Sequence, residues 1–184
     1  MGKRSVFKRR EKDFYPTPKE AVLPLLSHLP PDGALFSEPC YGDGALAYWL
    51  SILGPYNLEF ACELQSSEDV GMDYPSLESA IKWETDALEV TDFGPIDYII
   101  TNPPWDRKIL HPMINHFRSY KPTWLLFDAD WSHTKQASEY LKYCQKIISV
   151  GRIKWIPDSK FTGKDNCAWY LFVDHETTTQ FVGR

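Results

Sequence analysis

The chain alternates short apolar runs with segments in which apolar residues recur every three to four positions. The short runs predict buried strands at 34–37, 58–62, 81–85, 96–100 and 124–127. The periodic segments predict helices at 18–29, 45–53, 109–120 and 135–144. Two further strands, at 147–156 and 168–173, follow each other without a helix. Strands separated by helical crossovers predict a doubly wound α/β fold, with a mostly parallel seven-stranded sheet and an antiparallel C-terminal hairpin at its edge.

Several residues mark where these elements begin and end. Thr17 is expected to cap the first helix, with Pro18 at its first position and Glu20 at the capping-box position. Pro30-Pro31 ends that helix. Pro103-Pro104 ends the fourth strand, because proline has no N–H to donate to a neighbouring strand.

The composition is typical of one globular domain. The 184 residues are 43% hydrophobic and 24% charged, which excludes intrinsic disorder. No run reaches the ~20 apolar residues that span a bilayer, and no apolar signal segment follows the charged N-terminus. We therefore expect a single domain at 13–184, no membrane association and a cytoplasmic location. The four cysteines are expected to be reduced and buried, because Cys40, Cys62, Cys144 and Cys167 lack zinc-ligand spacing.

The net charge of -5 conceals a strong polarity along the chain. Residues 1–12 hold six Lys/Arg and one Glu, residues 13–97 two Lys/Arg and sixteen Asp/Glu, and residues 98–184 twelve Lys/Arg and eight Asp/Glu. A polyanion would be attracted to the first and last of these blocks. We expect 1–12 to be a flexible basic tail. Its charge is compatible with phosphate binding, and equally with an ordinary solvated leader.

Polar residues and glycines follow three of the predicted strands. In an open parallel sheet, ligands bind beyond the carboxyl ends of the strands. The segment 38–44 contains two glycines and leads into a helix, so its backbone can approach a ligand closely. Glu63 ends the next strand and can accept hydrogen bonds from ribose hydroxyls, and Asp86 ends the third. Each feature alone has another explanation. The loop is also compatible with a tight turn that binds no ligand, and each carboxylate is compatible with a helix cap or a solvent-exposed loop charge.

The segment Asn102-Pro103-Pro104-Trp105 is the most specific motif in the chain. Such a string arises by chance at roughly one in 10⁵ positions. An Asn side-chain carbonyl and a backbone carbonyl can both accept hydrogen bonds from one planar NH₂ group, and the prolines stiffen the loop. The aromatic ring offers a face on which a base can stack. The alternative is a prolyl turn with a core tryptophan.

These motifs together resemble the class I S-adenosylmethionine-dependent methyltransferases, and especially the small DNA adenine-N6 methyltransferases of phages and plasmids. The matching segments are 13–18, 38–44, Glu63, Asp86, 102–105 and the terminal hairpin at 151–172. The resemblance implies a Rossmann-like fold, S-adenosylmethionine as the cofactor and a bacterial or phage-infected host cytoplasm. The implied cofactor-binding residues are Tyr15, Thr17, Glu38, Pro39, Cys40, Gly42, Gly44, Glu63, Asp86 and Asn102. Tyr41 is a departure from the family, because it stands within the cofactor loop at a point where the family pattern varies, and it could give the pocket a different shape.

The resemblance also implies a reaction. A methyl group would pass to an exocyclic amine, adenine N6 in DNA, on a base that is flipped out or single-stranded, without a metal or covalent intermediate. The implied catalytic residues are Asn102, Pro103, Pro104 and Trp105. Trp131 and His133 follow the fifth predicted strand and are candidates for lining the entrance of the same pocket. The alternative for both is an ordinary packing or surface position.

Related DNA enzymes usually carry a target-recognition domain, for which this sequence has no obvious counterpart. We therefore expect weak sequence selectivity or a partner subunit that supplies it. Phosphate contacts would come from Arg107, Lys108, Arg152, Lys154, Lys160 and Lys164.

Two alternatives remain open at this point. The acceptor amine could belong to a protein glutamine or to RNA, because a side-chain amide is also a planar NH₂ group. The chain could also be a non-catalytic cofactor-binding or nucleic-acid-binding module of a paired methyltransferase.

Overall fold

The computed structural model describes residues 15–70, 81–156 and 162–184. The basic tail expected at 1–12 and the candidate residue Lys160 lie outside the described residues.

An eight-stranded mixed sheet forms the centre of the described structure, in the order β3-β2-β1-β4-β5-β7-β6-β8. Strands β1 to β5 run parallel, β7 is antiparallel to both β5 and β6, and β8 pairs in parallel with β6. The predicted fold class is confirmed, with one strand more than the seven expected. The strands are β1 Ala34–Glu38, β2 Tyr56–Cys62, β3 Ile81–Lys82, β4 Tyr98–Thr101, β5 Thr123–Asp128, β6 Cys144–Gly151, β7 Cys167–Phe172 and β8 Gln180–Val182.

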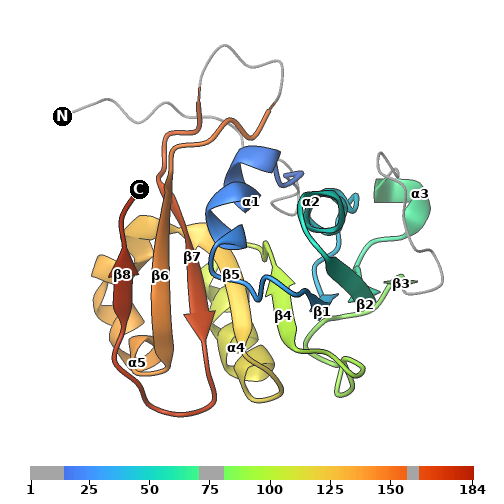
Figure 1. Ribbon diagram of the computed structural model, residues 1–184. Helices are drawn as coiled ribbons and strands as arrows, with labels where there is room; N and C mark the ends of the chain where they lie inside the picture. Colours follow the sequence, from blue (N-terminus) through green and yellow to red (C-terminus); the bar gives the residue numbers. More distant parts are fainter. Residues whose placement is uncertain (1–14, 71–80, 157–161) are drawn as a thin grey trace.

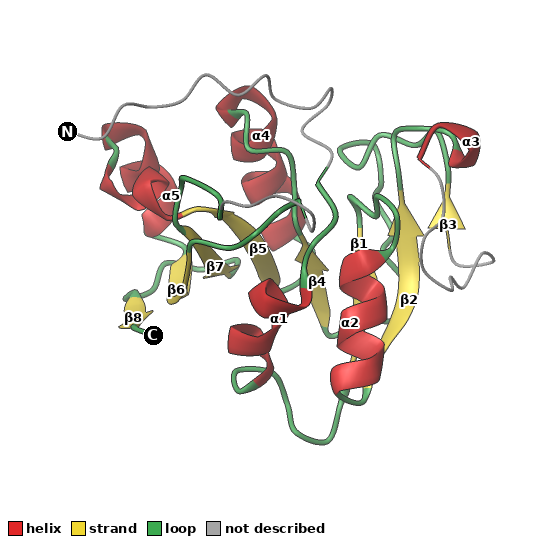
Figure 2. Ribbon diagram, turned by 90° about the horizontal axis from the view of Figure 1, so that it is seen from above, coloured by secondary structure: helices red, strands yellow, loops and turns green. Residues whose placement is uncertain are grey.

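Helices cover both faces of the sheet (Figures 1 and 2). One face carries α1 Lys19–Leu26 and α2 Ala45–Leu53, and the other carries α4 Arg107–Arg118, the 3₁₀ turns η3 Ala129–His133 and η4 Lys135–Ala137, and α5 Ser138–Leu141. The short helix α3, Ser67–Val70, lies near the β3 edge. The buried apolar residues form two clusters, one on each face. This layering is what the alternating strand and helix patterns require.

Strands β5 and β7 are the most deeply buried, because each has neighbours on both sides and helices on both faces. All six residues of β7 are buried. The indole Nε1 of Trp169 in β7 donates a hydrogen bond to the carbonyl of Ala21 in α1, at 2.7 Å. This bond satisfies the polar atom of a fully buried ring and fixes α1 against the sheet.

The first helix begins later than expected. It starts at Lys19, and Pro18 stands at the N-cap position without a side-chain cap. The predicted capping role of Thr17 is therefore wrong. Its hydroxyl faces Asn102 instead, because the chain before α1 passes along the carboxyl end of β4.

The helix predicted at 135–144 is also wrong in extent. Only η4 and the four-residue α5 form there, and β6 already begins at Cys144. The strand ends at Gly151, whose φ of 84° turns the backbone away from the sheet, so the strand predicted at 147–156 is displaced toward the N-terminus. The hairpin partner β7 lies inside the sheet rather than at its edge, because β8 pairs beyond β6.

The four cysteines are free thiols. Cys62, Cys144 and Cys167 are buried as expected, whereas Cys40 is half-buried. Burial raises the pKa of each buried thiol to about 12, which keeps these thiols protonated at neutral pH. Within the described residues, no helix has the length and apolarity to cross a membrane.

Candidate active site

A cavity of about 570 Å³ opens at the sheet edge where β1, β2 and β4 end. The cavity lies where parallel strands on either side of β1 diverge into loops, which is the usual ligand position in this architecture. Ten of the predicted catalytic and cofactor-binding residues line it: Tyr15, Thr17, Glu38, Pro39, Cys40, Gly42, Glu63, Asp86, Asn102 and Pro104. Gly44, Pro103 and Trp105 are not among the lining residues.

The loop after β1 takes a conformation that depends on its glycines. Gly42 and Gly44 have φ angles of 56° and 86°, which L side chains rarely adopt. A Cβ atom on Gly44 would lie 2.6 Å from the hydroxyl oxygen of Tyr41. The absence of a side chain at Gly44 thus permits both the turn and the close approach of Tyr41. Tyr41 is buried against the edge of the Trp83 ring and lines the cavity.

Glu63 ties this loop to the next strand. Its Oε2 accepts a hydrogen bond from the Gly42 N–H at 2.9 Å, and its Oε1 accepts one from the Gln65 N–H at 3.1 Å. The Gln65 side-chain Nε2 also donates to Oε1, at 3.5 Å. A carboxylate has about four lone-pair positions, so Oε2 retains capacity for another donor. Glu63 can therefore hold the loop and still accept hydrogen bonds from a bound ribose.

Asp86 reaches the cavity because the chain turns sharply after β3. Glu84 has a φ of 52°, and the Thr85 N–H donates to the Glu63 carbonyl at 2.9 Å. The predicted strand 81–85 consequently ends at Lys82. Asp86 Oδ1 accepts from the Leu88 N–H, so this carboxylate also caps the turn that carries it.

Glu38 is the most unusual group in the cavity wall. It is only 2% exposed, and its Oε2 has no hydrogen-bond partner. Burial, with a smaller contribution from nearby Asp43, raises the pKa of this carboxyl well above its ordinary value. A buried carboxyl group with an unsatisfied oxygen can give up its proton when a cationic group binds beside it, and S-adenosylmethionine carries two such groups, its ammonium and its sulfonium. The residues present therefore fit the expected cofactor.

Asn102 follows β4 and has a defined amide orientation. Its Nδ2 donates to the hydroxyl of Thr17 at 3.1 Å and to the carbonyl of Tyr15 at 3.5 Å. Its Oδ1 accepts from the indole Nε1 of Trp105 at 3.4 Å. An indole N–H only donates and a backbone carbonyl only accepts, so these partners fix which side of the amide is oxygen. The oxygen of Asn102 keeps a second lone pair for an incoming amine.

Three aromatic rings lie beside Asn102. The ring of Trp105 meets that of Trp155 edge to face, with centroids 5.6 Å apart. Tyr15 approaches the same Trp155 ring at 6.3 Å. Trp155 comes from the segment between β6 and β7, which is distant in sequence. Pro103 is buried and Trp105 is half-buried, so part of the Trp105 ring stays accessible next to the amide.

Sequence analysis missed several residues of the cavity. Met113 and Ile109 of α4 form part of its wall, and Met113 contacts the thiol of Cys40 at 4.0 Å. Their spacing marked them only as an apolar helix face. Lys108, predicted to bind nucleic acid, also lines this cavity.

The other predicted basic residues are spread over the same half of the molecule. Arg107 is exposed and donates to the side chain of Gln136 at 3.1 Å. Lys154 and Lys164 are exposed on the segment between β6 and β7, and Arg152 lines a second cavity.

The structure separates the two candidates for the cavity mouth. Trp131 is a core residue at 2% exposure, and its Nε1 donates to His111 Nε2 at 3.0 Å, so for this ring the packing alternative is correct. Burial lowers the pKa of His111, which favours the neutral imidazole that can accept this bond. His133 lines the second cavity. Among the described residues, no group of three or more His, Cys, Asp or Glu is placed to hold a metal ion.

No family model matches the sequence, and no curated protein matches it. Solved structures do match. One from Pyrococcus horikoshii, assigned as an RNA methyltransferase, has a TM-score of 0.63 and 18% identity over 86% of each chain. One from Listeria monocytogenes, assigned to the class I S-adenosylmethionine-dependent methyltransferases, has a TM-score of 0.53 and 11% identity over 89% of this chain and 61% of that one.

A third structure is the methyltransferase subunit of a type I restriction-modification system from Streptococcus thermophilus, with a TM-score of 0.53 and 12% identity. The match covers 92% of this chain and 47% of that subunit, so the chain spans about half of its length. At these identities the shared property is the architecture: the chain has the Rossmann-like fold of S-adenosylmethionine-dependent methyltransferases.

Proposed function

We propose that this protein is an S-adenosylmethionine-dependent methyltransferase that modifies an exocyclic amino group, adenine N6 in DNA. The observation that carries the proposal is the amide of Asn102. Its oxygen is oriented by Trp105, Thr17 and Tyr15, and it lies in the same cavity wall as the unsatisfied carboxylate of Glu38. An acceptor for an amine and an acceptor for a cationic cofactor thus line one cavity.

When bound, S-adenosylmethionine would supply a methyl group that leaves its bonding electron pair on sulfur and bonds to the amine nitrogen, with one amine proton passing to solvent. Asn102 Oδ1 accepts a hydrogen bond from the target NH₂ and orients its nitrogen. Glu38 and Glu63 bind the cationic and ribose parts of the cofactor. Most of the rate advantage comes from holding the two reactants in line.

Trp105 is the candidate for stacking on the target base. Its indole N–H is held by Asn102 and its ring by the edge contact with Trp155, so the ring is fixed before a base arrives. Base–aromatic stacking contributes about 1 to 3 kcal/mol per base. Because a base inside a duplex cannot reach such a site, the substrate is flipped out or single-stranded.

Nucleic acid is favoured as the acceptor by charge and by the neighbours. Residues 98–184 carry twelve Lys/Arg against eight Asp/Glu. One neighbour is assigned to RNA methylation and another belongs to a restriction-modification system. The latter is a subunit, which supports a partner that supplies sequence selectivity for this chain as well.

Methyl transfer from labelled S-adenosylmethionine to DNA, RNA and protein tests the proposal. Asn102→Ala should reduce kcat and kcat/KM together by about 100-fold or more while leaving cofactor affinity nearly unchanged. Asn57→Ala, on the exposed side of β2, is the matched control and should retain full turnover. Trp105→Ala should weaken base capture by about 1 to 3 kcal/mol, whereas Trp105→Phe should retain much of the activity.

Mass spectrometry of nucleosides from the modified DNA then identifies the product. N6-methyladenine supports the proposal, and N4-methylcytosine would correct the base. Labelled methyl groups found only in RNA or only in protein would show that DNA is not the acceptor. Full turnover by Asn102→Ala would refute the assigned mechanism, and no transfer to any amine would favour a non-catalytic module.

A further inference from the structure

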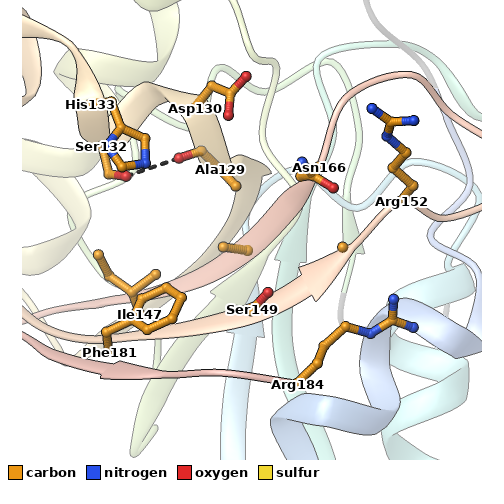
Figure 3. A pocket seen from close by; sticks show the side chains of 12 residues that line it. Ala129, Asp130, Ser132, His133, Ile147, Ser149, Arg152, Asn166, Phe181 and Arg184 are labelled. Carbon is orange, nitrogen blue, oxygen red and sulfur yellow. Dashed lines mark hydrogen bonds between the residues drawn. The ribbon is translucent and has the colours of Figure 1, made fainter.

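A second cavity, of about 460 Å³, lies between η3 and the strands β6 and β8 (Figure 3). Its walls come from four elements that are distant in sequence. The lining residues are Ala129, Asp130, Ser132, His133, Ile147, Ser149, Gly151, Arg152, Asn166, Ala168, Phe181 and Arg184. None of the residues assigned to the active-site cavity is among them, so the two cavities are separate.

The sheet topology places this cavity on the same edge as the active site. Strand β6 is antiparallel to β7, which is antiparallel to β5, so β5 and β6 end on the same side as β4. Asn102 follows β4, and Arg152 follows β6 three strands away. At about 4.8 Å per strand, that separation is about 14 Å. A stacked strand of about 3.4 Å per nucleotide covers this distance in about four steps.

One end of the cavity is cationic. Arg152 follows the last residue of β6 and Arg184 lies two residues beyond β8, and these two strands pair in parallel. In Figure 3 both guanidinium groups lie at this end of the cavity. A Cβ atom on Gly151 would stand 2.8 Å from a guanidinium nitrogen of Arg184, so the missing side chain allows Arg184 to lie against the strand. Asp130 is the carboxylate among the lining residues, and it lies on the η3 side.

The opposite end is apolar and aromatic. Ile147 of β6 and Phe181 of β8 are register partners, so their side chains lie next to each other in the cavity wall. Phe181 is 68% exposed, which is unusual for a phenylalanine in a strand. An exposed aromatic face beside an aliphatic floor is a stacking platform for a nucleobase. Ser149 lies between the two ends and offers a hydroxyl that can donate or accept a hydrogen bond.

We propose that this cavity binds one nucleotide of the substrate strand, with its phosphate at the end that carries Arg152 and Arg184 and its base against Phe181. The proposal rests on the proposed nucleic-acid acceptor and adds a subsite about four nucleotides from the target base. Guanidinium groups bind phosphate through two parallel hydrogen bonds, and phosphate contacts position a strand without reading its sequence. The subsite therefore fixes the register of the strand rather than the identity of a base.

Fluorescence anisotropy of a fluorescein-labelled twelve-nucleotide single-stranded DNA, measured at several salt concentrations without cofactor, tests the subsite. Arg152→Gln and Arg184→Gln should each weaken binding about fivefold at low salt and reduce the salt slope by about 0.7, the value for one phosphate contact in a single strand. Phe181→Ala should weaken binding at least fivefold with an unchanged slope, because stacking releases no counterions. The control Lys142→Gln removes one exposed charge at the opposite edge, before β6, and should have little effect.

Different outcomes separate the subsite from the proposed function. Equal losses in Arg152→Gln, Arg184→Gln and Lys142→Gln would overturn the subsite, as would full affinity in Phe181→Ala. Failure of the wild-type protein to bind the oligonucleotide would also overturn it. Methyl transfer is measured separately with the wild-type protein, so weaker binding in the cavity variants without any transfer would support the subsite and refute the proposed function.

Discussion

Replacing Glu38 with glutamine is expected to stabilise the cofactor-free protein and to weaken its binding of S-adenosylmethionine. The carboxyl group is 2% exposed and its Oε2 has no partner. Burial, and then the charge of Asp43, raise its pKa well above the ordinary value. A group of this kind costs folding free energy whenever it is ionised.

The sign of the pH dependence follows from the proton count. Because the pKa of Glu38 is raised in the folded state, the folded protein holds a proton that the unfolded chain has already lost. The free energy of unfolding contributed by Glu38 therefore falls as pH rises from its unfolded pKa toward its folded pKa. Glutamine removes this dependence. The stability difference between Glu38→Gln and wild type should be small near pH 4 and should grow as the pH rises.

An unsatisfied buried acceptor costs about 1 to 3 kcal/mol, and more when it is charged. The amide nitrogen of glutamine would still lack a partner, so we expect a net gain of about 1 kcal/mol at pH 8. For a domain of this size that corresponds to an increase in Tm of about 2 to 4 °C. Loss of a hydrogen bond to a charged group should weaken cofactor binding by about 1.5 to 3 kcal/mol, or about 10- to 100-fold.

Thermal unfolding followed by circular dichroism at pH 4, 6 and 8 measures the first effect, and isothermal titration calorimetry with S-adenosylmethionine measures the second. Glu59→Gln is the matched control, because Glu59 is exposed in β2 and its substitution should change stability by less than about 0.5 kcal/mol. Lower stability of Glu38→Gln across the whole pH range would refute the unsatisfied-carboxylate interpretation. Unchanged cofactor affinity would refute the role of Glu38 as the acceptor of a cationic group.

Two further substitutions test the loop between β1 and α2. Glu63→Gln should lose about 1 to 3 kcal/mol of stability in a urea unfolding titration as well as cofactor affinity in calorimetry, because an amide NH₂ would face one of the two N–H groups that the carboxylate now accepts. Unchanged urea stability would show that Glu63 does not hold the loop. Gly44→Ala should lower Tm by several degrees, because it combines a φ of 86° with a contact of 2.6 Å to the Tyr41 hydroxyl. A Tm equal to that of wild type would show that the loop relaxes freely.

Local patterns were sufficient for most of the strands and for the position of the site. The helix predicted at 45–53 matches α2, and the buried run at 124–127 lies within β5. Asn102, Glu63 and Asp86 line one cavity because parallel strands bring their carboxyl ends to one edge, a consequence of topology that the order of strands and helices already implies.

The sequence did not reveal the roles of residues whose main contact is with a distant part of the chain. Thr17 has the sequence context of a helix cap, yet its hydroxyl accepts a hydrogen bond from Asn102, 85 residues away. Trp131 follows a strand end like the site residues, but its ring is buried against His111 and β7. For Thr17, a long-range partner outweighed a local capping preference worth about 1 kcal/mol.

The sequence by itself determined where β1, β2, β4 and β5 end to within one residue, because the length of an apolar run is a local property of the chain. Only the tertiary structure decided which oxygen lone pairs of the site residues already accept hydrogen bonds from the protein. Glu63 accepts two backbone N–H groups, Glu38 keeps an oxygen without a partner, and Trp105 orients the amide of Asn102. It also decided that β8 pairs with β6 and brings Phe181 and Arg184 beside Arg152. Hydrogen-bond satisfaction and strand pairing depend on groups that meet only when the chain folds, and no spacing along the sequence encodes them directly.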